Sequence, residues 1–211
     1  FLKYFLSYYM IKKIIKRTFD IIISFITIVI LLPIFIIISI IIVMETGFPV
    51  FYKQKRLGKN SKEFFLYKFR SMVKDADKIG TLVTVKNDPR ITRSGKFLRK
   101  TKLDEFPQFF NVLKGDMSLV GPRPEVKKYA DYYIEDFNYI LSKVKPGITD
   151  WASIKFRHEE HLLENEKDFE THYINELLPK KLMLAKNYAD NNNLFIDIAI
   201  LIKTVFVVIL C

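Results

Sequence analysis

Two adjacent carboxylates, Asp104 and Glu105, are the residues whose types and spacing best suit chemistry. They lie in the segment RKTKLDEFPQ, residues 99–108. Thr101-x-x-Asp104 resembles a capping box, and Pro107 fits only the first turn of a helix, so we expect both carboxylates at a helix N-terminus. There one carboxylate can face a substrate while its neighbour, about 100° round the helix, holds a metal. Acidic residues are also ordinary in first turns, and composition alone favours that plainer interpretation.

The two carboxylates lie in a strongly basic chain. It has 34 Lys and Arg against 23 Asp and Glu, a net charge of +11. This excess suits an anionic ligand such as a diphosphate, lipid headgroups or nucleic acid, and a solvated surface facing a membrane is the simpler alternative. We expect no nucleic-acid partner, because no binding signature accompanies the charge and the single Trp151 offers no stacking platform. The basic residues in question are Lys68, Arg70, Arg90, Arg93, Lys96, Arg99, Lys100, Lys102 and Arg123.

Other patterns of reactive residues are weak. His158 and His161 flank two glutamates, but they are three positions apart, unlike the histidine pair of a zinc protease helix. The sequence contains no phosphate-binding P-loop, no dinucleotide fingerprint and no GxSxG nucleophile motif. Cys211 is the single cysteine, which excludes an internal disulfide.

A membrane segment precedes the charged part of the chain. Residues 21–44 are 24 consecutive uncharged positions, long enough to cross a bilayer core, which needs about 20. Pro33 in the middle of this segment removes a backbone hydrogen bond and kinks a helix. The two flanks, 1–20 and 45–64, each carry five Lys or Arg, so the rule that positive charge stays on the cytoplasmic side predicts no orientation for the segment. We expect a re-entrant helix with both ends at the cytoplasmic face, and a single spanning anchor is the alternative.

The predicted fold class is α+β and mainly helical. A re-entrant membrane helix would carry a small cytoplasmic domain with a short β-hairpin and interfacial amphipathic helices. In the last segment a spanning helix would bury Asp197 and Lys203 at about 2.5–3.5 kcal/mol each, so we expect this helix to be interfacial or packed on the domain. The predicted regions are a basic and aromatic juxtamembrane segment (1–18), a membrane helix broken at Pro33 (19–45), a cytoplasmic domain (46–193) and a C-terminal apolar helix (194–211).

Local patterns predict the elements of the cytoplasmic domain. Two β-prone runs on either side of a turn-rich GKNS segment indicate a hairpin. Breaker residues indicate loops over 71–95 and 116–124. The expected strands are 50–54 and 64–69, and the expected helices are 96–101, 103–114 ended by Gly115, 125–142, and 159–190 interrupted near Pro179, with a linker at 191–193.

Several motifs together resemble one known family, the bacterial sugar transferases, also called monotopic phosphoglycosyl transferases. The long central motif is too specific for a chance match. The motifs are KRTFD (16–20), Pro33, PVFYKQKRLG (49–58), YKFRSM (67–72), DPRITRSGKFLRKTKLDEFPQFFNVLKGDMSLVGPRPE (88–125) and VKPGIT (144–149).

The resemblance implies an enzyme at the cytoplasmic face of the bacterial inner membrane. It would move a sugar-1-phosphate from a UDP-sugar to a polyprenol phosphate such as undecaprenyl phosphate, releasing UMP with Mg²⁺ as cofactor. This would be the first membrane step of surface glycan assembly. Asp104 resembles the nucleophile, which would form a covalent phosphosugar intermediate, and Glu105 its metal-binding partner. Arg99 and Arg123 resemble phosphate-handling arginines, and Arg70 belongs to the KFR motif.

Some questions stay open at the level of sequence. The common continuation after VKPGIT is GWAQ, whereas this chain has DWAS at 150–153, a region that bears on the sugar pocket; the sugar is therefore left open. Leu32 stands where the family usually has Ser before the membrane proline. A homodimer is considered among the partners. The alternatives to an active enzyme are an inactive membrane-docked scaffold of a glycan-assembly complex and a basic nucleic-acid-binding protein on a spanning anchor.

Overall fold

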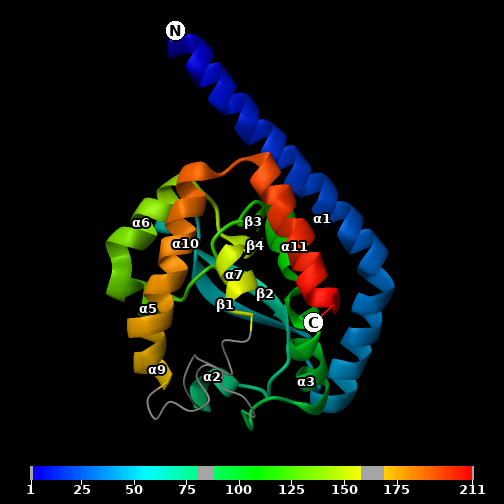
Figure 1. The fold of residues 1–211 in the computed structure, drawn as a ribbon. Coiled ribbons are helices and arrows are strands. Elements are labelled where there is room, and N and C mark those ends of the chain that lie inside the picture. The colour runs from blue at the N-terminus through cyan, green and yellow to red at the C-terminus, as the bar shows by residue number, and fades with distance from the viewer. Residues whose placement is uncertain (1, 80–87, 158–168, 211) are drawn as a thin grey trace.

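The computed structural model describes residues 2–79, 88–157 and 169–210. It is mainly helical, as predicted, with two small β-sheets at its centre (Figure 1). The helices are α1 (Leu2–Thr46), α2 (Ala76–Ile79), α3 (Arg93–Lys100), α4 (Gln108–Lys114), α5 (Lys127–Ala130), α6 (Ile134–Lys143), α7 (Trp151–Lys155), α9 (Phe169–His172), α10 (Leu178–Asn191) and α11 (Leu194–Leu210).

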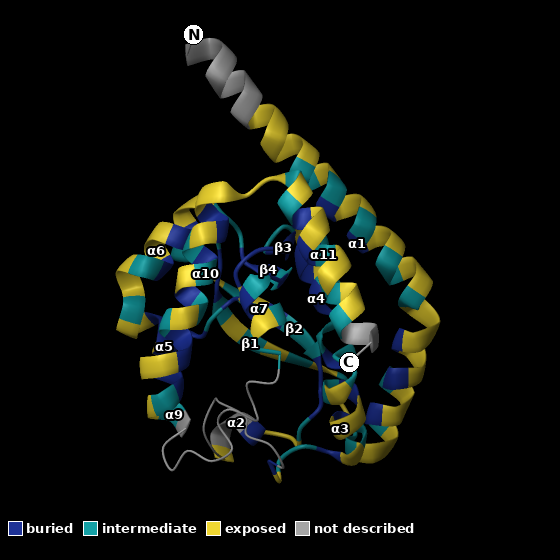
Figure 2. Cartoon of the chain, in the orientation of Figure 1, coloured by how far each residue is buried: buried dark blue, intermediate teal, exposed yellow. Residues whose placement is uncertain are grey.

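Helix α1 is the apolar segment expected from the sequence. Its part Met10–Thr46 is long and apolar enough to cross a membrane, and only 17% of its most apolar stretch is buried, unlike the core helix of a soluble protein. The exposed apolar face is visible in Figure 2. The helix continues through Pro33 instead of ending there. A proline removes one bond of the helical ladder and bends a helix that neighbouring turns still hold. Figure 1 shows α1 curving around the rest of the chain.

The predicted hairpin is confirmed. Strands β1 (Phe51–Leu57) and β2 (Glu63–Phe69) pair antiparallel, with Phe51 opposite Phe69 and Leu57 opposite Glu63. The turn between them contains Asn60 in the left-handed region at φ 56°, a conformation that asparagine tolerates better than most residues.

A second, parallel pair of strands was not predicted, and its first strand lies inside the loop expected at 116–124. Strand β3 (Ser118–Val120) pairs with β4 (Gly147–Thr149), with Ser118 opposite Gly147 and Val120 opposite Thr149. Parallel strands bring their carboxyl ends to the same edge of a sheet. The residues that follow β3 and β4 therefore lie together, and this edge faces the candidate site described below.

Several predicted helix boundaries are wrong for local reasons. Helix α3 begins at Arg93 because the Thr92 side chain accepts a hydrogen bond from the Gly95 amide at 3.0 Å, a cap that the loop prediction missed. The helix expected over 125–142 is divided into α5, a 3₁₀ turn (Asp131–Tyr133) and α6. Helix α4 does end at Gly115, which takes the left-handed conformation at φ 96°.

The last predicted body helix is only partly described, because 158–168 lie outside the described residues. From α9 the chain continues through a π-helical turn (Tyr173–Leu177) directly into α10. The interruption expected near Pro179 takes the form of this π-helical turn, which ends two residues before the proline. Pro179 itself lies at the start of α10.

The described apolar core consists of three clusters. The first packs α6 against α10, with Ile140 and Leu182 buried in it. The second surrounds β3 and includes Leu119 and the fully buried Ile200 of α11. The third joins α1 to α3 and the hairpin, and consists of Phe35, Ile38, Ile42, Phe69 and Leu98.

Helix α11 packs on the body and beside α1. Its Asp197 is only 1% exposed and accepts hydrogen bonds from the Tyr188 hydroxyl at 2.7 Å and from Lys16 of α1 at 2.9 Å. Lys16 also binds Asp20 at 2.9 Å, and Asp20 in turn accepts a hydrogen bond from Ser118 of β3. This buried polar cluster links both apolar helices to the central strands.

Candidate active site

The two carboxylates lie on a short connection between α3 and α4. Asp104 and Glu105 belong to a single 3₁₀ turn (Leu103–Glu105) that Lys102 enters in the left-handed region at φ 57°. The predicted capping box is wrong, because the Thr101 hydroxyl donates backwards to the Phe97 carbonyl of α3 at 2.8 Å. Helix α4 begins only after Pro107. The carboxylates therefore precede a helix instead of occupying its first turn.

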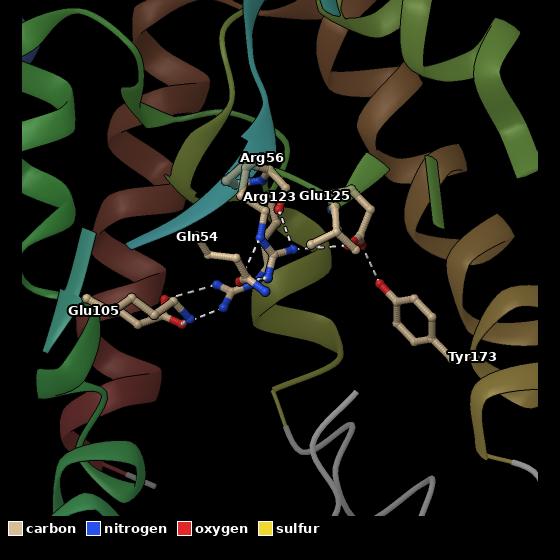
Figure 3. Close-up of polar contacts among 9 residues, drawn as sticks. Gln54, Arg56, Glu105, Arg123, Glu125 and Tyr173 are labelled. Atoms are coloured by element: carbon tan, nitrogen blue, oxygen red, sulfur yellow. Dashed lines mark hydrogen bonds and ion pairs between the residues drawn. The ribbon is translucent and has the colours of Figure 1, made fainter. Parts of the chain in front are cut away.

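Glu105 is held by two cations from distant parts of the chain. Lys68 of β2 donates to Oε1 at 2.9 Å. Arg123 donates through Nη1 to Oε2 at 3.0 Å and through Nη2 to Oε1 (Figure 3). Burial by itself raises the pKa of Glu105, but Arg123 and Lys68 outweigh it and hold that pKa well below its usual value. Burial lowers the pKa of Lys68, and Glu105 opposes that change. Glu105 is thus a stable carboxylate.

Asp104 has a different environment from its neighbour. It is 4% exposed, and its Oδ1 is buried with no hydrogen-bond partner. Burial, with the charge of Glu105 as the next cause, raises the pKa of Asp104, while Lys68, Arg99 and Lys102 oppose that rise. A buried carboxylate oxygen without a partner costs free energy unless a ligand uses it. Two adjacent carboxylates therefore have pKa values shifted in opposite directions, an arrangement typical of divided catalytic roles.

The loop that carries Arg123 is fixed by residues that the sequence analysis did not single out. Arg56 of β1 donates to the Pro124 carbonyl and to Glu125 Oε1, each at 3.1 Å. The Tyr173 hydroxyl donates to Glu125 Oε2 at 2.5 Å, and Figure 3 shows this chain of contacts leading towards Glu105. Arg56 and Glu125 lie in the PVFYKQKRLG and GPRPE motifs, which did not reveal that the two segments meet, and Tyr173 lies in no quoted motif.

The remaining predicted arginines have distinct surroundings. Arg70 is 6% exposed and donates to the Thr46 hydroxyl at 2.6 Å and to the Gly47 carbonyl, so it fastens the end of α1 to the hairpin. Its Nε and Nη1 are buried and have no hydrogen-bond partner. Arg99, on α3, is half-buried and close enough to Asp104 to favour its ionised form.

A cavity of about 1010 Å³ brings the predicted site residues together. Part of it is apolar, with Phe106 and Phe109 in its wall, and Lys and Arg outnumber Asp and Glu among its charged lining residues. Its lining includes all five predicted site residues, which are Arg70, Arg99, Asp104, Glu105 and Arg123. The arrangement can hold a polyanion against a carboxylate, which is otherwise an unfavourable contact.

The described residues contain no group of three His, Cys, Asp or Glu that could hold a metal ion. The histidine pair at 158 and 161 lies outside the described residues. Mg²⁺ does not need such a cage, because it is usually bound through one or two carboxylates together with waters and substrate phosphates. The unpartnered Asp104 oxygen and the carboxylate of Glu105 fit a magnesium site of that kind, provided that Glu105 shares its oxygens with Lys68 and Arg123.

A family profile described as "Bacterial sugar transferase" matches residues 11–211. The chain belongs to the bacterial sugar transferase family. This confirms the resemblance drawn from the motifs. The same match covers α1 from residue 11 onward, the candidate site and α11, so the site geometry belongs to the family's domain and not to an appended segment.

Named relatives within the family use different sugars. The chain is 35% identical over 197 residues to a UDP-N-acetylgalactosamine-undecaprenyl-phosphate N-acetylgalactosaminephosphotransferase of Aeromonas hydrophila, covering 90% of this chain and 43% of the relative. It is 38% identical over 213 residues to an undecaprenyl-phosphate galactose phosphotransferase of Salmonella typhimurium, covering 94% and 41%. It is 41% identical over 174 residues to a UDP-glucose:undecaprenyl-phosphate glucose-1-phosphate transferase of Escherichia coli, covering 79% and 37%. The chain thus spans less than half the length of each of these relatives.

Proposed function

We propose that this chain transfers a sugar-1-phosphate from a UDP-sugar to a polyprenol phosphate such as undecaprenyl phosphate and releases UMP. The observation that carries the proposal is the pair of carboxylates in the cationic cavity. Asp104 has a buried oxygen without a partner, while Glu105 is held by Lys68 and Arg123. The names of the sugar transferases similar to this chain describe the same type of reaction.

In the proposed first step an Asp104 oxygen attacks the β-phosphorus of the UDP-sugar. A bond forms between Asp104 and the sugar phosphate, and the bond from this phosphorus to the bridging oxygen breaks, its electron pair leaving with UMP. In the second step an oxygen of the polyprenol phosphate attacks the same phosphorus and releases the Asp104 carboxylate. Carboxylic acids and phosphate monoesters ordinarily ionise below neutral pH, and Lys68, Arg99 and Lys102 favour the ionised form of Asp104 against the effect of its burial, so neither step needs a strong general base.

Positive charge makes this reaction feasible, since a carboxylate and a diphosphate repel each other. Arg99 and Arg123 line the cavity beside the carboxylates and would bind the phosphate oxygens, as would the unpartnered donors of Arg70. Mg²⁺, when bound by Glu105 and substrate oxygens, would add charge that stabilises the UMP leaving group. A bound diphosphate offers Arg123 new acceptors, which would free oxygens of Glu105 for the metal.

The proposed location is the cytoplasmic face of the bacterial inner membrane, with α1 re-entrant. Support comes from contacts on both sides of Pro33. Arg17 donates to the Val112 and Leu113 carbonyls of α4 at 2.6 and 2.9 Å. Near the other end of α1, Glu45 accepts a hydrogen bond from the Arg93 amide at 2.7 Å. One charged domain binds both ends of the apolar segment, which favours both ends at the same membrane face.

The test is a UMP-release assay on the purified full chain with undecaprenyl phosphate and a panel of UDP-sugars. We expect release with at least one UDP-sugar and, without the lipid, a sugar-phosphate adduct on the Asp104 peptide in mass spectrometry. Asp104→Asn should form no adduct. Release of UMP with intersecting double-reciprocal plots, which indicate a sequential mechanism, and with no adduct would overturn the covalent step. A well-folded protein that is inactive on every UDP-sugar would support the inactive scaffold.

The proposed metal role has its own test. Glu105→Gln preserves shape but removes the charge that a cation needs, so Mg²⁺ binding in the presence of a UDP-sugar should weaken strongly in calorimetric titration. Wild-type turnover should stop in EDTA and return with added Mg²⁺. Full activity in EDTA would exclude the metal from the reaction.

A further inference from the structure

We propose that Asp150, Ser153 and Arg157 form the subsite that recognises the sugar ring of the UDP-sugar and sets its specificity. The inference rests on the proposed function and adds residues to it. All three line the cavity that contains Asp104 and Glu105. Asp150 follows β4, Ser153 lies on α7, and Arg157 lies two residues beyond the end of α7. Helix α7 lies between α10 and α11 (Figure 1).

The parallel strand pair explains why this cluster lies beside the catalytic carboxylates. Asp150 directly follows β4, and Arg123 lies three residues beyond β3. The Gly121 amide donates to the Thr149 carbonyl at 3.0 Å, which holds the two strand ends together. Ligands of sheets with parallel strands commonly bind outside the carboxyl ends of those strands. A diphosphate bound to Arg123 would thus carry its sugar close to Asp150.

Two polar atoms of the cluster are left without partners. Ser153 Oγ and Arg157 Nη1 are both buried and make no hydrogen bond. Asp150 is 3% exposed and accepts a hydrogen bond from the Ser153 amide at 2.7 Å, which fixes its carboxylate at the start of α7. Most buried polar groups in proteins have partners, so orphaned groups beside a cavity indicate a polar ligand.

The chemistry of the three groups matches a sugar better than a phosphate. A buried carboxylate repels phosphate but accepts hydrogen bonds from hydroxyl or amide donors. A serine hydroxyl can donate or accept, and a guanidinium donates to hydroxyl or carbonyl oxygens. Burial raises the pKa of Asp150, while the hydrogen bond from the Ser153 amide and the nearby Arg123 and Lys181 favour its charged form. Sites built to hydrogen-bond a substrate hydroxyl reject analogues that lack it in the required orientation.

The experiment compares kcat/KM for UDP-glucose, UDP-galactose and their N-acetylamino counterparts in three variants. Asp150→Asn keeps the helix cap, since asparagine caps as well as aspartate, but it replaces one of the two acceptor oxygens of the carboxylate with an amide donor. Ser153→Ala keeps the backbone amide and removes the orphaned hydroxyl. We expect each of these two variants to lower kcat/KM for the preferred UDP-sugar about 10- to 100-fold. The ratio of this kcat/KM to the values for the other UDP-sugars should also fall. Lys155→Gln is the matched control, because Lys155 is exposed on α7 and does not line the cavity.

Binding and stability measurements separate recognition from a structural role. Calorimetric affinity for UDP, which has no sugar, should be unchanged in both variants, while the added affinity that the sugar provides should be lost. Ser153→Ala should not lower the melting temperature, because it removes an unsatisfied buried group. Equal losses for all UDP-sugars and for UDP, or unchanged ratios among the sugars, would overturn the sugar subsite. A wild-type protein that binds UDP-sugars but releases no UMP would instead overturn the proposed function.

Discussion

At the residue scale, the site separates two neighbouring carboxylates by their contacts. Glu105 receives hydrogen bonds from Lys68 and Arg123, whereas a buried oxygen of Asp104 receives none. The first arrangement stabilises a charge, and the second leaves a charge poorly solvated and available to react. A reactive group of this kind costs stability, which makes the proposed role of Asp104 measurable without any substrate.

Asp104→Asn should make the protein more stable at neutral pH. Folding raises the pKa of Asp104, so the folded state resists its ionisation. The cost that ionised Asp104 imposes on folding stability is absent below the pKa of this group in the unfolded chain and grows as the pH rises through its pKa in the folded protein. The gain from Asp104→Asn should therefore be larger at pH 8 than at about pH 4, the pKa of an unfolded aspartate, reaching about 1–3 kcal/mol, the usual cost of an unsatisfied buried group. Denaturant unfolding at both pH values measures it, and a variant less stable than wild type would contradict the prediction.

The same pair shows what sequence could reveal about single residues. Side-chain type and motif identified Asp104 and Glu105, and also Arg70, Arg99 and Arg123. They could not reveal that Lys68, 37 residues earlier, binds Glu105, since that contact depends on the packing of the hairpin against the 3₁₀ turn. The capping prediction was wrong because Lys102 reverses the chain in the left-handed region and Thr101 becomes the end of α3.

At the scale of elements, the short parallel pair β3 and β4 determines where the site loops meet. Each strand has only three residues, too few to show a periodic pattern. The hairpin, with strands of seven residues, was predictable because its β-prone runs flank a clear turn. Contacts that join distant segments, such as Val120 with Thr149, have no local signal in one sequence.

Gly147→Ala should disrupt this pair. A Cβ atom at Gly147 would lie 2.1 Å from the Gly121 amide nitrogen and 2.6 Å from its carbonyl oxygen, and these backbone atoms cannot rotate away. We expect a loss of about 1–3 kcal/mol, the usual cost of overpacking, together with a large loss of transferase activity. Thermal unfolding and UMP release measure the two effects. Gly58→Ala is the milder control, because a Cβ atom there would lie 3.0 Å from a Phe64 side-chain atom and 3.1 Å from the Lys62 carbonyl oxygen. Equal effects at both positions would contradict the argument.

Arg56→Lys should impair the site through the loop that carries Arg123. A lysine cannot reproduce the simultaneous contacts of the guanidinium with the Pro124 carbonyl, Glu125 and Gln54. We expect kcat/KM for the UDP-sugar to fall about 10- to 100-fold, as for the loss of charged hydrogen bonds. Lys55→Met on the same strand is the control, since the Lys55 side chain is 65% exposed and pairs only at the surface with Glu63. Wild-type activity of the Arg56 variant would show that the loop is held by other contacts.

At the scale of the whole molecule, α1 and α11 are joined to the domain by buried charges. Lys16 lies between Asp20 and Asp197, at 2.9 Å from each. Lys16→Met should leave two buried carboxylates without their cation and destabilise the fold by about 3–5 kcal/mol. Unfolding of the purified protein in detergent measures the loss. The double variant Lys16→Met/Asp197→Asn should recover part of it, and no recovery would place the damage elsewhere in α1.

The path of α1 through the membrane can be decided by labelling. The domain binds α1 before Pro33 through Arg17 and after it through Phe35, Ile38 and Ile42. If both ends therefore face the cytoplasm, single cysteines from Lys13→Cys and Lys55→Cys in a Cys211→Ser background should both resist a membrane-impermeant thiol reagent in intact cells. Both should react after permeabilisation, which controls for accessibility.

Pro33→Leu tests the physical cause of that path. Leucine restores the missing backbone amide and removes the clash that bends α1, so the apolar segment, long enough to cross the bilayer, should shift towards a straight spanning helix. A spanning helix would separate Arg17 from α4, or Glu45 from Arg93, because the domain can lie on only one side. We therefore expect one of the two cysteine positions to become labelled in this variant and transferase activity to fall with it. Labelling of one position in the protein that retains Pro33 would instead establish a spanning α1 and exclude the re-entrant path.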